Sequence, residues 1–204
     1  MAESMHRFPG YDVLAKRDTP SWNPQTRRVI EERLALPPQA HGFFTEAEWR
    51  TLNAVCARIL PQPPDRADPV PIAALLDQQM QQNRGDGFRQ ADMPPLREAW
   101  RRGLAAIEAE ARLRHGAAFH ALAAAQQDAL LHSIQQGEVR AAEWQGLPVA
   151  HFFKARLLHD IVDAYYAHPT AWNEIGFGGP ASPRGYVRMG FDRRDPWEAV
   201  ERKP

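Results

Sequence analysis

The stretch from Pro148 to Tyr186 constrains the fold most, because it changes abruptly from a helical pattern to one broken by glycine and proline. Apolar residues recur at helical spacing over residues 148–168, which Pro148 can open and Pro169 is expected to close. Four glycines and two prolines then lie between Gly176 and Gly185. Large apolar side chains stand among these breakers, namely Trp172, Ile175, Phe177 and Tyr186. So many apolar groups would not suit a solvated loop, so we expect the segment to pack on the protein's own core or on another chain.

The rest of the chain also shows helical spacing, and no run alternates as a strand would. Helix boundaries follow from local chemistry: Asn23 can cap a helix, Thr45 and Glu48 form a capping box, and Gly116 can stop a helix. The predicted helices cover about residues 24–35, 46–60, 71–81, 95–115, 124–136 and 148–168. The sequence therefore predicts an all-α fold, an irregular bundle of about five to six helices.

Prolines and glycines suggest three parts. Residues 1–42 read as an extended N-terminal arm with one short helix, residues 43–170 as the helical domain, and residues 171–204 as an extended C-terminal tail rich in glycine and proline. The arm carries apolar groups outside its helix, among them Phe8, Tyr11 and Trp22. Such an arm is either disordered or laid across a surface.

Composition excludes several classes of protein. The 204 residues carry 25 basic and 25 acidic side chains, whereas a nucleic-acid-binding protein usually has a basic excess, so we expect no nucleic acid partner. No stretch is long and apolar enough to insert in a membrane. The single cysteine, Cys56, excludes an internal disulfide and falls on the apolar face of a predicted helix, where it is expected to be buried.

Residues 26–30, TRRVI, resemble the start of a twin-arginine export signal. The segment that follows, EERLALPP, is charged where such a signal must be apolar. We therefore interpret Arg27 and Arg28 as the solvated face of a short helix. The sequence predicts a cytoplasmic chain, which would reach the periplasm only if it were exported with a signal-bearing partner.

No catalytic, cofactor-binding or metal-binding residue is predicted. His159 and Asp163 lie one helical turn apart and could face one ion, but a surface histidine beside a carboxylate is far commoner than a metal site. The GFGG run at 176–179 lacks the preceding strand and following helix of a phosphate loop. The alternative that stays open is a stand-alone helical enzyme with a metal or small-molecule site.

Several segments resemble the gluconate 2-dehydrogenase subunit 3 family. They are FFTEAEWRTL (43–52), ARILP (57–61), FHALAAAQQDALL (119–131), the pair Phe152-Phe153, YYAHP (165–169), WNEIGFGGP (172–180) and RGY (184–186). The WNEIGFGGP run is the most specific of these. The resemblance covers most of residues 43–188.

This resemblance implies a small, non-catalytic subunit that binds and stabilises a flavin-dependent dehydrogenase. In that family the large subunit is a glucose–methanol–choline (GMC) type oxidoreductase that holds FAD and oxidises a sugar, sugar acid or alcohol. A multihaem cytochrome c subunit often accepts the electrons. Many members carry a twin-arginine leader, and the arm stands in its place here. The resemblance thus implies FAD in the partner and no cofactor in this chain.

We expect the apolar tail and arm to contact that partner, because tryptophan and tyrosine dominate the energetics of such interfaces. The glycines would let the backbone lie close against the partner. The alternative is that the same residues pack within the chain. The expected contact residues are Tyr11, Trp22, Trp172, Asn173, Glu174, Ile175, Gly176, Phe177, Gly178, Gly179 and Tyr186.

Overall fold

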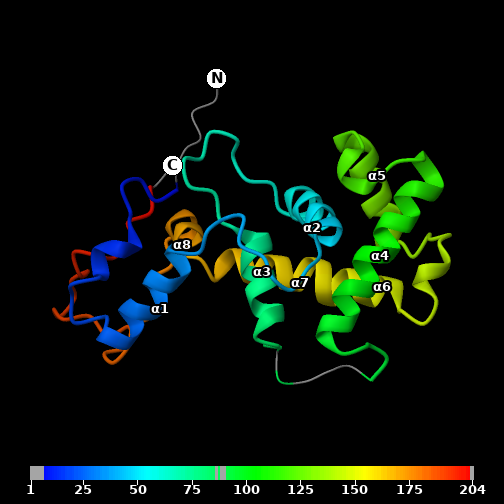
Figure 1. Ribbon diagram of the computed structural model, residues 1–204. Helices are drawn as coiled ribbons and strands as arrows, with labels where there is room; N and C mark the ends of the chain where they lie inside the picture. Colours follow the sequence, from blue (N-terminus) through cyan, green and yellow to red (C-terminus); the bar gives the residue numbers. More distant parts are fainter. Residues whose placement is uncertain (1–6, 86, 88–90, 203–204) are drawn as a thin grey trace. The chain divides into compact units, whose positions relative to one another are not determined.

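The computed structural model describes residues 7–85, 87 and 91–202, so the first six residues of the expected arm lie outside the described part. Helices are its regular elements, and the described residues include no strand (Figure 1). The prediction of an all-α fold is confirmed. The helices are α1 (Pro24–Leu34), α2 (Glu46–Ile59), α3 (Ile72–Gln81), α4 (Leu96–His115), α5 (Ala124–Gln135), α6 (Val149–Phe152), α7 (His159–Tyr166) and α8 (Pro169–Ile175).

The chain forms two compact units. The first comprises the described residues of Met1–Leu36, Asp68–Val70 and Tyr165–Pro204, and the second comprises those of Pro37–Ala67 and Pro71–Ala164. The three-part division expected from the sequence separated the arm from the tail. In the structure the arm and the tail belong to the same unit, and Figure 1 shows their blue and orange-to-red segments side by side around α1 and α8.

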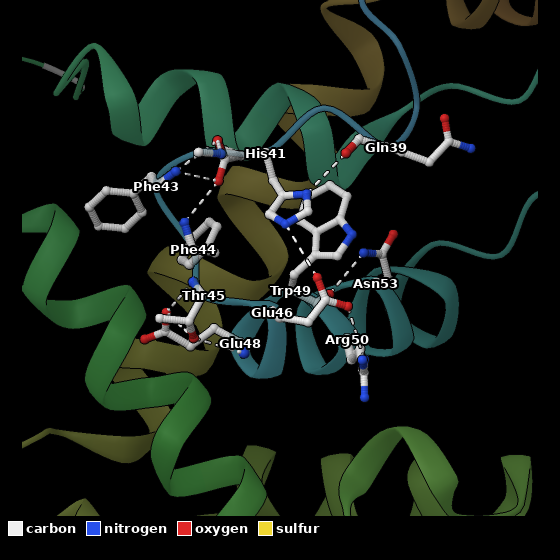
Figure 2. Close-up of polar contacts among 12 residues, drawn as sticks. Gln39, His41, Phe43, Phe44, Thr45, Glu46, Glu48, Trp49, Arg50 and Asn53 are labelled. Atoms are coloured by element: carbon white, nitrogen blue, oxygen red, sulfur yellow. Dashed lines mark hydrogen bonds and ion pairs between the residues drawn. The ribbon is translucent and has the colours of Figure 1, made fainter.

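In the second unit, helix ends follow the predicted local chemistry. The Thr45 side chain accepts a hydrogen bond from the Glu48 N–H, and the Glu48 carboxylate accepts one from the Thr45 N–H, which together make the capping box of α2 (Figure 2). His41 stacks on the Trp49 ring beside this cap, with 4.5 Å between ring centroids. At the end of α4, Gly116 adopts φ 70°, a left-handed conformation that suits glycine.

The helix predicted over residues 148–168 differs in two ways. Residues Phe153–Leu158 form a π-helical turn between α6 and α7, an irregularity that periodicity cannot reveal. The helix then ends at Tyr166, and Pro169 opens α8 instead of closing its predecessor. The tail is therefore helical at its start. The expectation that it is extended from residue 171 is corrected for residues 171–175, which belong to α8, and this helix ends at the left-handed Gly176.

One buried carboxylate fixes the chain that leads into α2. Asp77 on α3 is fully buried and accepts hydrogen bonds from the backbone N–H groups of Gly42, Phe43 and Phe44, at 2.8 to 3.2 Å. The Gln81 side-chain amide donates a further bond, at 2.6 Å. These three N–H groups belong to the irregular segment before the N-cap Thr45, where no helical partner exists, so the Asp77 carboxylate supplies the acceptor that they need.

We predict that Asp77→Ala lowers the free energy of unfolding by about 3 kcal/mol or more, because three backbone donors lose their acceptor in a buried place. The measurement is urea denaturation followed by circular dichroism. Asp128→Ala is the matched control, because Asp128 is an exposed carboxylate that pairs with Arg58 at 2.6 Å. An equal effect of both substitutions would contradict this account of Asp77.

Close packing at one glycine holds α4 against α6. A Cβ atom placed on Gly103 would lie 1.9 Å from Cζ of Phe152, whose side chain is fully buried. Any larger residue at this position must therefore displace the ring.

We predict that Gly103→Ala destabilises the chain by about 1–3 kcal/mol or more through overpacking. The variant Phe152→Leu makes room at the same contact, so the double variant should be more stable than the sum of the two single effects. A double-mutant cycle in urea measures this coupling. Additive effects would show that the two residues do not meet.

Candidate functional site

The arm and the tail share one hydrophobic cluster. Val13, Trp22 and Ile30 from the arm pack with Trp172 from α8, and all four side chains are at most 4% exposed. Hydrogen bonds join the same two segments. The Trp22 indole N–H donates to the Pro180 carbonyl at 2.7 Å, and the Val13 N–H donates to the Asn173 side chain at 2.8 Å. The arm is thus laid against the tail of its own chain.

Several residues expected to contact a partner are engaged inside this unit. Trp22 and Trp172 are buried, so neither is an exposed anchor in this fold. The Tyr11 hydroxyl donates to the Phe177 carbonyl at 3.0 Å, and the Glu174 carboxylate accepts from the Tyr165 hydroxyl at 2.6 Å. The apolar rings and polar groups of these residues are thus engaged by contacts and hydrogen bonds within the chain.

The expected glycines also serve contacts inside the chain. A Cβ atom on Gly176 would meet the Phe8 ring at 2.6 Å, and Gly176 has φ 65°. A Cβ atom on Gly178 would lie 3.1 Å from the Lys16 amine, and one on Gly179 would lie 3.0 Å from the Trp172 ring. The neighbours that come close to these three glycines belong to the same chain. Their contact with a partner stays a prediction.

Exposed apolar side chains are concentrated in the first unit. Ile175, Phe177 and Tyr186 are the exposed members of the expected contact set. The sequence reading missed the residues that follow, although the alternating apolar groups of YVRMGF at 186–191 indicate them. Phe191, at 93% exposed, is the most open of them all. We define the tail surface as Ile175, Phe177, Tyr186, Val187, Met189, Phe191 and Val200.

The second unit contrasts with the first. Among its described residues, Leu113 on α4 is the sole large hydrophobic side chain that is exposed. Its core carries the other bulky apolar groups, among them Trp100, Phe119 and Phe152, each with no exposed surface. Exposed apolar area is a mark of interaction surfaces, so the tail surface is the candidate functional site of this chain.

A cavity of about 580 Å³ lies beside the tail surface, within the same unit. Its walls come from the arm, through Tyr11 and Lys16, and from the tail, through Arg184, Tyr186 and Trp197. Burial is the main cause that raises the pKa of Tyr11 to about 12, with nearby Asp12 adding to it, so this hydroxyl is neutral at physiological pH.

The candidate residues for other chemistry do not line this cavity. His159 Nε2 lies 3.5 Å from Asp163, and the nearby Asp160 carboxylate is bound by the Trp100 indole N–H at 2.8 Å and by Arg156 at 3.1 Å. Burial raises the pKa of Asp160, against the opposing effect of Arg156. In the described part of the chain, no group of three or more His, Cys, Asp or Glu side chains is placed to hold a metal ion.

Cys56 is buried on α2, and burial raises the pKa of its thiol. A thiol that stays protonated is a poor nucleophile. This placement agrees with the prediction that Cys56 acts as a small hydrophobic residue of the core.

A comparison with protein families identifies one whose model matches residues 46–179, from α2 through α8 to Gly179. Its description is gluconate 2-dehydrogenase subunit 3. The chain belongs to the gluconate 2-dehydrogenase subunit 3 family. The resemblance seen in the sequence is confirmed. Comparisons with curated proteins and with solved structures gave no match.

The family match ends before most of the tail surface. Trp172, Ile175 and Phe177 fall inside it, whereas Tyr186 and the exposed residues after it fall outside, as does the arm. Within residues 7–85, 87 and 91–202, no helix is both long and apolar enough to span a membrane.

We predict that Trp172→Ala lowers the free energy of unfolding of the isolated chain by about 3–5 kcal/mol, because it empties the centre of the arm–tail cluster. Phe191→Ala is the control, since that ring is 93% exposed and its removal should leave stability unchanged. Thermal denaturation and limited proteolysis of the arm measure the difference. A Trp172→Ala chain as stable as the parent would mean that this indole serves a partner instead.

Proposed function

We propose that this chain is the non-catalytic small subunit of a flavin-dependent dehydrogenase complex. Membership of the gluconate 2-dehydrogenase subunit 3 family supports a role in a dehydrogenase assembly. The proposed partner is a GMC-type catalytic subunit that holds FAD and oxidises a sugar, a sugar acid or an alcohol. A cytochrome c subunit as electron acceptor and a cytoplasmic location both stay predictions.

The observation that carries this proposal is the uneven distribution of exposed apolar side chains. The larger, helical unit exposes one such residue among those described, whereas the arm–tail unit exposes the whole tail surface. Covering these groups on association removes apolar area from water, a favourable contribution of about 25 cal/mol for each Å² that is offset by the freedom lost on binding. We propose that the tail surface binds the catalytic subunit.

The proposal assigns no reacting group to this chain. The buried carboxylates Asp77 and Asp160 are engaged by hydrogen bonds that stabilise the fold, and neither lines the cavity beside the tail surface. The chain would therefore act by binding and by stabilising its partner, while the partner's flavin supplies the redox chemistry.

We predict that the triple variant Val187→Ser, Met189→Ser and Phe191→Ser weakens the complex by tenfold or more, since loss of apolar anchors typically costs about 2 kcal/mol. The test co-expresses the tagged chain with a GMC-type flavin dehydrogenase from the same genome and measures flavin absorbance in the purified material. Activity for each assembled complex should not change.

Leu113→Ser on α4 is the matched control, because Leu113 is 60% exposed but lies in the other unit. It should leave the complex intact. If Leu113→Ser dissociates the complex and the triple variant does not, the partner binds the helical unit and the tail surface is wrongly assigned. If the parent chain recovers no flavoprotein, the proposed function itself fails.

A further inference from the structure

Three cations and two carboxylates line the cavity beside the tail surface. The cations are Lys16, Arg184 and Arg188, and the carboxylates are Asp195 and Glu198. The fixed charges of the cavity therefore leave one positive charge in excess, because the Tyr11 hydroxyl stays neutral.

Both carboxylates are occupied by the arginines. Asp195 accepts from Arg184 Nη2 at 2.9 Å and from the Met189 N–H at 3.0 Å. Although burial acts to raise the pKa of Asp195, these hydrogen bonds hold it below the ordinary value. Glu198 accepts from Arg188 at 3.0 Å and from the Asp195 N–H at 3.1 Å. Both carboxylates are thus engaged by arginine, and neither forms an ion pair with the third cation.

Lys16 is that third cation, and it is 5% exposed. Its amine donates to the Gly178 carbonyl at 2.5 Å and lies 5.8 Å from the centre of the Tyr186 ring. In the described chain it forms no ion pair with a carboxylate. Burial first, and then the positive charge of Arg184, lower the pKa of Lys16, whereas the charges of Glu198 and Asp195 act to raise it. A buried ammonium that makes no direct ion pair is costly to the fold, and a bound anion would reduce that cost.

Arg184 lines the same cavity and has hydrogen-bond donors without an acceptor. Its Nη2 donates to Ser21 and Asp195, and its guanidinium lies 5.5 Å from the centre of the Trp197 ring. Its Nε and Nη1 atoms are buried and have no hydrogen-bond partner among the described residues. Unsatisfied donors on a buried charged group are costly, so they favour binding of an acceptor.

The geometry points to an anion site at Lys16 and Arg184 that takes a single carboxylate. One excess positive charge matches one carboxylate better than a divalent phosphate. The aromatic rings of Tyr11, Tyr186 and Trp197 suit a small organic body behind the charged group. Two sources share this chemistry: a free small carboxylic acid, and an acidic side chain of the catalytic subunit. Only the second source depends on the proposed function.

The first arm of the test uses the full chain alone. Isothermal titration calorimetry compares sodium gluconate with sorbitol at constant ionic strength, since both are open-chain polyols and differ only in a carboxylate or a hydroxyl at C1. If the source is a free acid, gluconate binds, sorbitol does not, and affinity falls as pH rises through the pKa of Lys16. Lys16→Met should lower the affinity for gluconate by tenfold or more. The chain should stay folded, because an apolar group replaces a buried cation.

The second arm uses the complex. Acylation of lysines by an N-hydroxysuccinimide ester is followed by mass spectrometry, with the exposed Lys154 as internal reference. If the source is the partner, Lys16 reacts more slowly relative to Lys154 in the complex than alone. The complex should also be weakened about tenfold by Lys16→Met and much less by Lys16→Arg, which keeps the charge.

The outcomes separate the two proposals. Gluconate binding without complex formation supports the anion site and overturns the proposed function. Complex formation in which Lys16→Met and Lys16→Arg behave alike, together with no gluconate binding, overturns the anion site and leaves the proposed function standing. No gluconate binding and no complex overturns both.

Discussion

The structure of the arm–tail unit depends on the burial of two indole rings from opposite ends of the chain. Trp22 and Trp172 lie in one cluster, and each indole N–H has a carbonyl acceptor, on Pro180 at 2.7 Å and on Tyr166 at 2.5 Å. A segment as short as either the arm or the tail cannot bury such a ring alone, because a small unit has too little interior. Each segment therefore folds only against the other, and the cavity walls and the tail surface exist because they do.

This use of tryptophan separates stability from recognition. Aromatic residues are the expected anchors of an interface, yet the largest ones in the arm and tail are needed inside the unit. Smaller apolar groups remain for contact with solvent or a partner, together with Phe177, Tyr186 and Phe191. Two glycines also serve packing within the unit. Gly176 and Gly179 make room for Phe8 and Trp172 of the same chain, so they shape the tail surface without being part of it.

Electrostatics follows from the same packing. Lys16 is drawn into the unit because its neighbour Val13 belongs to the buried cluster, and Arg184 enters from the tail. Packing brings Lys16 and Arg184, which are far apart in the sequence, to the same cavity. The carboxylates there pair with arginine, as when Arg188 donates from Nε to Oε1 and from Nη2 to Oε2 of Glu198. The result is a local positive excess in a chain whose net charge is zero.

The sequence by itself determined the features that depend on neighbours in the chain: the all-α class, the Asn23 and Thr45 caps, and the left-handed Gly116, because each arises from interactions within a few residues. The resemblance to the gluconate 2-dehydrogenase subunit 3 family was also visible in the sequence, because short runs of residues carry it. Local patterns erred at Pro169, which can end one helix or begin another, and they gave no hint of the π turn at Phe153–Leu158. Only the tertiary structure decided that Trp172 faces inward, that Phe191 faces outward, and that Lys16 meets Arg184, because these outcomes depend on which distant segment covers each side chain.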